Sequence, residues 1–306
     1  MKYLYVVLLL LVFLLILGIV TFTWTSKNRI VPKEDLDGPI PVEREPLLKS
    51  IPKKLHQTQK KIEDLPKGIQ KTLKRTEKLH PNCEYTFYDD EACNRFMEEN
   101  FHPRIVNAYN TLIPGAYKAD LFRYCLLYMY GGLYLDANMY CLKSFEDILW
   151  PETGDKYQFI TSVDESHIGS AYNAFIASVP KHPILAMAIN ICVHRIERRE
   201  YGTSALYPTG PYALGDAINL YFDLQPGTPI MAGPQGSDVL MIMRVPRVKS
   251  RHCYFGSTIC EPTSVLLYKG KEYADTKYPG YFVDYRNHRK KTYYLNLWRD
   301  KRIYHD

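Results

Sequence analysis

The feature that most constrains the fold is an apolar, tyrosine-rich stretch at residues 116–130 that runs directly into Gly131 and Gly132. The stretch has the length and pattern of a helix, and two consecutive glycines predict the point at which that helix ends. The following residues, "LYLD", predict a short buried strand that finishes on Asp136. A helix joined at once to a buried strand predicts a sheet against which helices pack.

Strand and helix patterns alternate on both sides of this stretch. Before it, "KKLHQT" and "EYTFYD" predict strands, whereas residues 66–79 and "DEACNRFMEENF" predict helices. After it, "FITSV" and "YNAFIAS" predict strands and "HPILAMAINICVHRIERR" predicts a helix. This alternation predicts an α/β fold with a mostly parallel central sheet. In open sheets of that kind, ligands bind beyond the carboxyl ends of the strands, where Asp136 is expected.

The N-terminal residues predict a membrane anchor. Residues 3–24 carry no charge and are long enough to cross a bilayer core. A cleaved signal peptide would have a shorter apolar core and a small-residue cleavage site. We therefore expect a transmembrane anchor over residues 1–26, a proline-punctuated stem over 27–50 and one globular domain over 51–306. Basic residues flank the anchor on both sides, so its orientation stays open.

Charge and cysteine content exclude few classes of protein. The net charge is +6, but the basic residues form no continuous arm with interleaved aromatics, so a nucleic-acid partner is not expected. The chain has seven cysteines, whose spacings match no zinc site. Cys253 and Cys260 could close a small loop in an oxidising compartment, or all seven could be thiols.

Asp120 and Arg123 form the first candidate site. They are three residues apart near the start of the predicted helix and therefore share one face of it. Such a pair could be an exposed ion pair that contributes a few tenths of a kcal/mol, about the usual value for this spacing. Their position sixteen residues before an acid at a strand end favours a functional site instead.

Asp136 and Asn138 form the second candidate site. A carboxylate at the end of a buried strand loses solvent, which disfavours its charged form unless a cation offsets the loss. Oxygen-bearing side chains at i and i+2 can both reach one hard cation, as Mg²⁺ and Mn²⁺ require. Such a cation would hold a diphosphate and stabilise it as a leaving group. The same two residues could instead form an Asx-type turn, and the spacing alone does not choose between these readings.

Residues 117–149, "YKADLFRYCLLYMYGGLYLDANMYCLKSFEDIL", resemble the DXD-motif region of the sugar-binding glycosyltransferase family. That family includes α-1,6-mannosyltransferases, inositol-phosphoceramide mannosyltransferases and α-1,4-galactosyltransferases. The segments "IPKKLHQTQK", "YNAFIASVPKHPIL" and "YPTGPYAL" are also similar to family segments, so the resemblance covers most of residues 51–222. It extends more loosely to the C-terminal "NLWRDKRIY".

The resemblance implies a GT-A-type fold and an enzyme that moves a hexose, with mannose favoured, from GDP-mannose or a UDP-hexose. The acceptor would be a glycan or a glycolipid, the anomeric configuration would be retained, and Mn²⁺ or Mg²⁺ would be the cofactor. In a eukaryote it implies a Golgi- or ER-type membrane. Retention could use a carboxylate nucleophile or front-face attack. Nothing in their spacing selects Asp216 or Asp238 for such a role.

The resemblance also implies roles for individual residues. Asp120 and Arg123 would contact the donor sugar, and Asn173 would face the transferred sugar. His56, Gln57 and Thr58 would lie at the base, Asp136 would contact the metal and the ribose, and Asn138 and His288 would bind the metal. Thr209, Gly210 and Pro211 would shape the pocket, and Trp298 would close it. The simpler readings are an ordinary turn at Gly210-Pro211, a strand-edge hydrogen bond at Asn173 and a solvated His288.

Three positions depart from the family pattern. Asn138 stands where the second acid of the motif is usual, Gln59 where tryptophan is usual, and Leu297 where serine is usual. An amide oxygen can still bind a hard cation, but it adds no charge. These departures support an alternative, a weakened or inactive relative that binds glycans or a partner protein. A metal-dependent phosphodiesterase or nuclease would need more clustered acids and histidines than the chain has.

Overall fold

The end of helix α5 (Gly115–Tyr130) is fixed by the two glycines that follow it. Gly131 has a φ of 61° and its N–H donates to the carbonyl of Leu127 at 2.8 Å, which caps the helix. Gly132 has a φ of 98°, and a Cβ there would lie 2.7 Å from the carbonyl oxygen of Lys54. Glycine at both positions therefore allows strand β3 to start at once beside β1.

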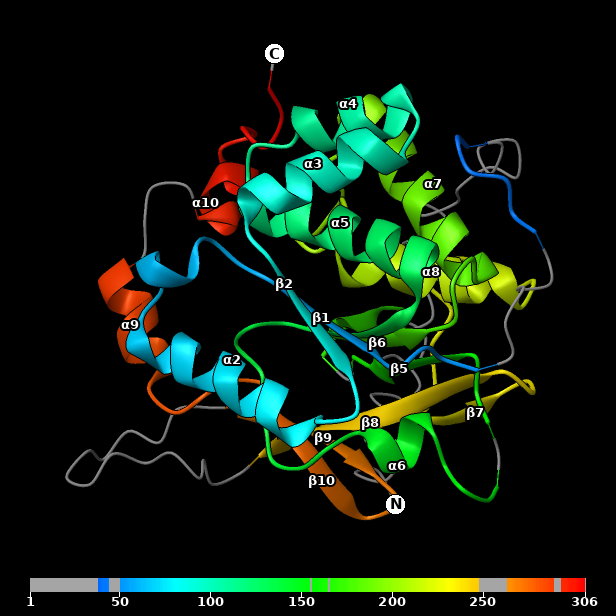
Figure 1. The fold of residues 1–306 in the computed structure, drawn as a ribbon. Coiled ribbons are helices and arrows are strands. Elements are labelled where there is room, and N and C mark those ends of the chain that lie inside the picture. Colours follow the sequence, from blue (N-terminus) through cyan, green and yellow to red (C-terminus); the bar gives the residue numbers. More distant parts are fainter. Residues whose placement is uncertain are drawn as a thin grey trace, which may run out of the picture.

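The structure is a computed structural model that describes residues 38–43, 50–154, 156–164, 166–247, 263–288 and 293–305. Helices pack against a central sheet (Figure 1). The strands are β1 (Lys54–Thr58), β2 (Glu84–Tyr88), β3 (Gly132–Leu135), β4 (Tyr140–Cys141), β5 (Phe159–Val163), β6 (Ala171–Ser178), β7 (Gly233–Gln235), β8 (Val239–Arg247), β9 (Thr263–Tyr268) and β10 (Lys271–Asp275). The other helices are α2 (Lys67–Leu79), α3 (Asp90–Asn100), α4 (Pro103–Thr111), α6 (Glu146–Leu149), α7 (Pro183–Glu197), α8 (Pro211–Tyr221), α9 (Tyr281–His288) and α10 (Tyr294–Arg299), with a 3₁₀ turn at Ile62–Asp64.

The α/β class and each strand and helix named from the sequence are confirmed, but the prediction of a mostly parallel sheet is wrong. The strand order is β2-β1-β3-β6-β5-β8-β9-β10-β4, with β7 paired to β8. Among the described strands, only β1–β2, β1–β3 and β5–β8 pair in parallel. The alternation of strand and helix stops after β3: residues 164–170 join β5 to β6 and leave no room for a crossover helix, so these two strands pair antiparallel.

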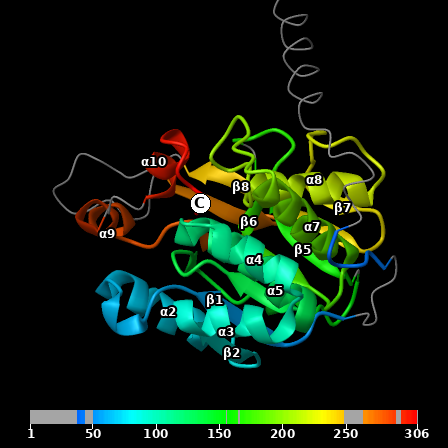
Figure 2. The ribbon, with the colours of Figure 1, turned by 90° about the horizontal axis from the view of Figure 1, so that it is seen from above.

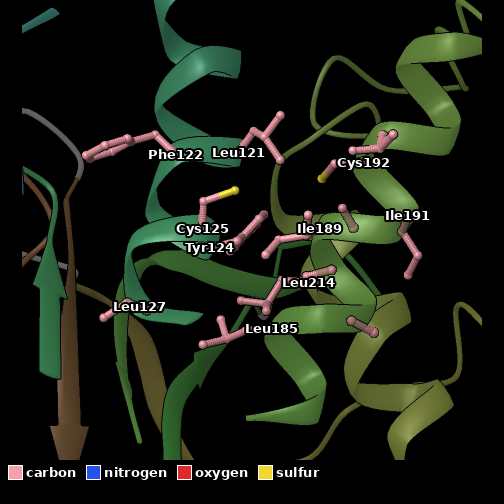
Figure 3. Close-up of a cluster of buried hydrophobic side chains, with 14 of the residues drawn as sticks. Leu121, Phe122, Tyr124, Cys125, Leu127, Leu185, Ile189, Ile191, Cys192 and Leu214 are labelled. Carbon is pink, nitrogen blue, oxygen red and sulfur yellow. The ribbon is translucent and has the colours of Figure 1, made fainter. Parts of the chain in front are cut away.

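Two apolar clusters lie on opposite faces of the sheet. One joins α3, α4, α5, α7 and α8 to strand residues such as Tyr134 and Ile176, and Figure 2 shows these helices grouped together. Figure 3 shows part of it, where side chains of α5 face those of α7. The other cluster holds Leu133, Leu135 and Phe175, which alternate along the strands with the first set. Strands β3 and β6 are thus buried on both faces, which fixes the position of α5 and of the residues after β3.

Only part of the predicted N-terminal organisation lies within the described residues. Ile40 of the predicted stem packs into the first cluster, and its N–H and C=O form hydrogen bonds with the side chain of Asn190 at 3.1 and 2.8 Å. The predicted anchor at 1–26 lies outside the described residues, as do Cys253 and Cys260. Across the described ranges, no helix combines the length and apolar character needed to cross a membrane. Five cysteines are free thiols: Cys83, Cys93, Cys125, Cys141 and Cys192.

Candidate functional site

A single guanidinium joins the two candidate sites of the sequence. Nη2 of Arg123 lies 3.2 Å from Oδ1 of Asp120 and 3.2 Å from Oδ1 of Asp136. The side chain of Arg123 is 5% exposed, and those of Asp120 and Asp136 are 13% and 29% exposed. The reading of Asp120 and Arg123 as a solvated surface pair is therefore wrong. Burial opposes the charge of Arg123, but the two carboxylates raise the pKa of the guanidinium above its usual range.

Asp120 is held from three sides. Nδ2 of Asn173 on β6 donates to its Oδ1 at 2.8 Å, and Oγ1 of Thr209 donates to its Oδ2 at 3.2 Å. Burial and the charge of Asp136 raise the pKa of Asp120 to about 6, although Arg123 and the two hydrogen bonds favour its ionised form. A carboxylate accepts about four hydrogen bonds. Three partners therefore leave room for one further donor, such as a hydroxyl group.

Tyr124 links α5 to the turn before α8. Its phenol receives a hydrogen bond from Nδ2 of Asn173 at 3.0 Å and donates to the carbonyl of Gly210 at 3.3 Å. Gly210 precedes Pro211, the first residue of α8. A Cβ on Gly210 would lie 3.0 Å from the Leu206 carbonyl and 3.3 Å from Oδ2 of Asp120. The turn read as Thr209-Gly210-Pro211 thus packs tightly against the carboxylate of Asp120.

Asp136 follows β3 at its carboxyl end. The carbonyl of Asp136 accepts from the N–H of Met139 at 3.0 Å, which closes a backbone turn, and the phenol of Tyr134 donates to Oδ1 of Asp136 at 3.3 Å. A turn is therefore present, but the Asp136 carboxylate itself contacts Tyr134 and Arg123. The guanidinium of Arg123 also lies over the Tyr134 ring, 4.7 Å from its centroid.

The predicted base-binding segment lies in β1 beside this turn. β1 and β3 are parallel with His56 opposite Tyr134, and the same register continued by two residues sets Thr58 opposite Asp136. His56 is buried, its Nε2 lies 3.1 Å from the Gly131 carbonyl, and burial lowers its pKa to about 4. His56 is therefore a neutral histidine at neutral pH. Gln57 is buried as well, and its amide donates to the Leu135 carbonyl at 3.3 Å.

The residues Asp136 and Asn138 fit a divalent cation as oxygen ligands. Oδ1 of Asn138 is buried and has no hydrogen-bond partner among the described residues. The Asn138 side chain also forms a hydrogen bond with Tyr281 that lowers the phenol's pKa, although burial raises it overall. The amide oxygen, which has no partner within the described ranges, stays available for a ligand.

The rest of a metal-binding set is not assembled by the described residues. Within the described ranges, no group of three or more His, Cys, Asp or Glu side chains lies close enough to hold a metal ion. His288 is the last residue of α9, and its side chain is outside the described part of the chain. Its role as a metal ligand stays a prediction.

A second group of charged side chains borders the site, and no local sequence pattern predicted it. Arg244 on β8 pairs with Asp164 and lies over the ring of Tyr172, 4.9 Å from its centroid. Tyr172 interacts electrostatically with Asp136 and with Arg244. Lys277, which follows β10, interacts with the same two charges. Sequence spacing could have indicated two tyrosines of the site. Tyr124 lies one helical turn after Asp120 and interacts with it electrostatically, and Tyr134 lies on the same side of its strand as Asp136 and bonds to it.

The remaining named residues hold structural partners. The indole of Trp298 donates to the Tyr201 carbonyl at 2.8 Å and packs against the first apolar cluster. Asp216 is buried and pairs with Arg195 at 2.5 Å. Asp238 accepts from the phenol of Tyr221 at 2.6 Å and lies 3.4 Å from Nε2 of His182. Asp216 is fully buried, whereas the Asp238 side chain is 19% exposed, and the partners named here are not members of the Arg123 network.

Comparison with known proteins identifies the segment that carries the site. Residues 66–160 match the profile of a family described as glycosyltransferase sugar-binding region containing DXD motif. This range includes Asp120, Arg123, Asp136 and Asn138. The Arg123 network thus lies mostly inside the matched segment, whereas Asn173 and Thr209 join it from beyond.

Several curated proteins are similar in sequence. An uncharacterized glycosyltransferase of Acanthamoeba polyphaga mimivirus is 30% identical over 47% of this chain and 57% of its own length. A mannosyl phosphorylinositol ceramide synthase of Saccharomyces cerevisiae is 28% identical over 59% of this chain and 46% of its own. An inositol phosphoceramide mannosyltransferase of Schizosaccharomyces pombe is 29% identical over 54% and 44%. The chain thus spans about half the length of the curated relatives it matches.

One solved structure, the PaToxG glycosyltransferase, is similar over 67% of this chain and 76% of its own, with a TM-score of 0.47 and 16% identity.

Proposed function

Because residues 66–160 belong to the family of glycosyltransferase sugar-binding regions containing a DXD motif, we propose that this protein is a retaining hexosyltransferase. It transfers a hexose, with mannose favoured, from GDP-mannose or a UDP-hexose to a glycan or glycolipid. Two relatives are named as a mannosyl phosphorylinositol ceramide synthase and an inositol phosphoceramide mannosyltransferase. These names support mannose as the transferred sugar and a glycolipid as the acceptor. We further propose that residues 1–26 anchor it in a membrane of the Golgi or ER type and that 51–306 form the catalytic domain.

The observation that carries the proposal is the bridge from Asp120 through Arg123 to Asp136. Asp120 can still accept one further hydrogen bond, and Asp136 follows the end of strand β3. The bridge therefore holds these two carboxylates close together. In the proposed complex, Asp120 accepts a hydrogen bond from a sugar hydroxyl, and Arg123 keeps Asp120 ionised despite its burial. Asn173 and Thr209 orient Asp120, so the hydroxyl meets a carboxylate in one position only.

Asp136 and Asn138 would hold the divalent cation, Mn²⁺ or Mg²⁺, by their oxygen atoms. Bound there, the cation supplies positive charge that stabilises the leaving diphosphate. In the structure Asp136 already accepts hydrogen bonds from Arg123 and Tyr134. His56 pairs with Tyr134, two residues before Asp136, and this register supports the proposal that residues 56–58 border the nucleotide.

A panel of nucleotide sugars tests the function. We expect thermal stabilisation of the protein by one of them with Mn²⁺, since a ligand that binds the native state raises its stability. The stabilising donor should also be hydrolysed slowly, or transferred to a lipid acceptor. Asp136→Ala should abolish this turnover, whereas Glu98→Ala, at an exposed acid of α3, should not. Absence of both nucleotide binding and turnover in the wild type would exclude the proposed enzyme.

A second candidate function is a relative without catalytic activity that binds a glycan or a partner protein. Asn138 favours it, because the amide brings no charge to a site where the described residues offer no further cluster of metal ligands. This candidate predicts that sugars or glycans stabilise the wild type, that Mn²⁺ makes no difference and that no donor is consumed.

A further inference from the structure

Lys277 and Asn138 both interact with Tyr281 at the edge of the proposed donor site. Strands β10 and β4 pair antiparallel, with Asp275 opposite Tyr140. Lys277 follows Asp275 by two residues, and Asn138 precedes Tyr140 by two residues. The ammonium group of Lys277 lies 4.3 Å from the ring centroid of Tyr281, whose phenol is a hydrogen-bond partner of Asn138. The three side chains therefore meet at one place.

The charge of Lys277 is not neutralised by an adjacent carboxylate. Arg123 is paired with Asp120 and Asp136, and Arg244 is paired with Asp164. No described carboxylate lies within 4 Å of the Lys277 ammonium, although Asp136 interacts with it at longer range. Lys277 is half-buried, and a half-buried ammonium without a close counter-ion loses hydration that an anionic ligand would replace.

Asn138 accounts for this arrangement. An aspartate at position 138 would place a negative charge near Lys277 and attract its ammonium group. The amide leaves the ammonium without such a partner and leaves its own oxygen unbonded. This edge of the site is therefore more positive for two reasons. Position 138 holds a neutral amide instead of an acid, and position 277 holds a lysine.

We propose that Lys277 binds the diphosphate of the nucleotide donor and, beside Asn138, supplies part of the positive charge that a divalent cation would otherwise provide. The proposal rests on the proposed function, since it assumes that a nucleoside diphosphate group occupies the space next to Asp136. A diphosphate oxygen can accept a charge-assisted hydrogen bond from the ammonium. Donor binding should accordingly persist in part when divalent cations are removed.

Calorimetric titration with UDP and GDP tests this, with Mn²⁺ and separately with EDTA. Lys277→Met removes the charge at similar volume and should weaken binding of the preferred nucleotide by about 10- to 100-fold in both conditions. Lys277→Arg should stay close to the wild type. The matched control is Lys269→Met, which removes an exposed lysine from the β9–β10 turn and should change nothing. Any binding of uridine or guanosine, which lack phosphates, should not respond to Lys277→Met.

A double-mutant cycle with Asn138→Asp tests the coupling. In EDTA, Asn138→Asp should weaken diphosphate binding more in the presence of Lys277 than after Lys277→Met, because the new acid pairs with the lysine. If the wild type binds UDP or GDP and Lys277→Met, shown to be folded by its melting curve, binds equally well, the role of Lys277 is overturned and the function stands. If the wild type binds neither nucleotide in either condition, both proposals fall.

Discussion

The amide nitrogen of Asn173 lies 2.8 Å from a carboxylate oxygen of Asp120, although 53 residues separate the two in the chain. Asn173 comes from a strand buried on both faces and Asp120 from a helix packed on that strand, so their distance is set by core packing rather than by a loop. The contact brings the segment after the DXD motif to the helix before it. Four predictions follow from the network around this pair.

Removal of the central guanidinium should destabilise the protein strongly. Arg123→Met removes a buried guanidinium and leaves the partly buried carboxylates of Asp120 and Asp136 without their shared counter-ion, which should lower the free energy of unfolding by about 3 kcal/mol. Arg104→Met is the matched control, because Arg104 pairs with Glu197 on the surface, and it should lower that free energy by about 1 kcal/mol or less. Chemical denaturation measures both changes. Equal losses in the two variants would contradict a buried bridge.

Stability should depend on pH through Asp120. Its pKa is raised to about 6 in the folded protein, so the folded state holds a proton that the unfolded state releases near pH 4. The resulting stabilisation is present below pH 4 and is lost as the pH rises to 6 and above. The stability of the wild type minus that of Asp120→Asn should therefore fall by about 2 kcal/mol between pH 4 and pH 7.

The difference between the two proteins is the relevant quantity, because His56 acts in the opposite sense. Its pKa is lowered to about 4, so the stability it contributes rises between pH 4 and 6.5. The same histidine is present in wild type and variant, so its contribution cancels when the two denaturation series are subtracted. A difference that stays constant or rises across this range would show that Asp120 is not the group with the raised pKa.

A methyl group at position 210 should reduce activity more than stability. In Gly210→Ala the new Cβ lies 3.3 Å from Oδ2 of Asp120 and must displace it by a few tenths of an ångström. We expect kcat/KM for the donor to fall about tenfold, since small misplacements at a reacting centre reduce rate steeply. Gly115→Ala, where a Cβ meets nothing within 4 Å, should leave kcat/KM unchanged. Equal kinetics in both variants would place Asp120 outside the site.

An added carboxylate at position 138 should strengthen cation binding. Asn138→Asp restores a second charged oxygen ligand beside Asp136, and we expect the Kd for Mn²⁺ to fall about tenfold or more. Calorimetric titration of the nucleotide-free protein with MnCl₂ measures it. Asn110→Asp adds the same charge on the exposed surface of α4 and serves as the control. A Kd that changes equally in both variants would indicate a non-specific effect of charge.

The sequence alone determined the local elements and the chemical identity of the site. The helical spacing placed Asp120 and Arg123 on one face, the glycine pair ended that helix, and the position of Asp136 after an apolar run put it at a strand end. These are short-range properties, because helix and strand periods and glycine conformations depend on neighbours within a few residues. The same local patterns supported the resemblance to a sugar-binding region.

The tertiary structure alone decided how the pieces meet. Whether a strand pairs in parallel or antiparallel depends on the length of the connection and on burial across the whole sheet, so the alternation of elements gave the wrong sheet type. The site joins residues from distant parts of the chain. Examples are the bridge through Arg123, the contacts of Asn173 and Thr209 with Asp120, and the approach of Lys277 and Asn138 to Tyr281. No period or spacing encodes such contacts, because they arise when packed strands and helices bring distant segments together.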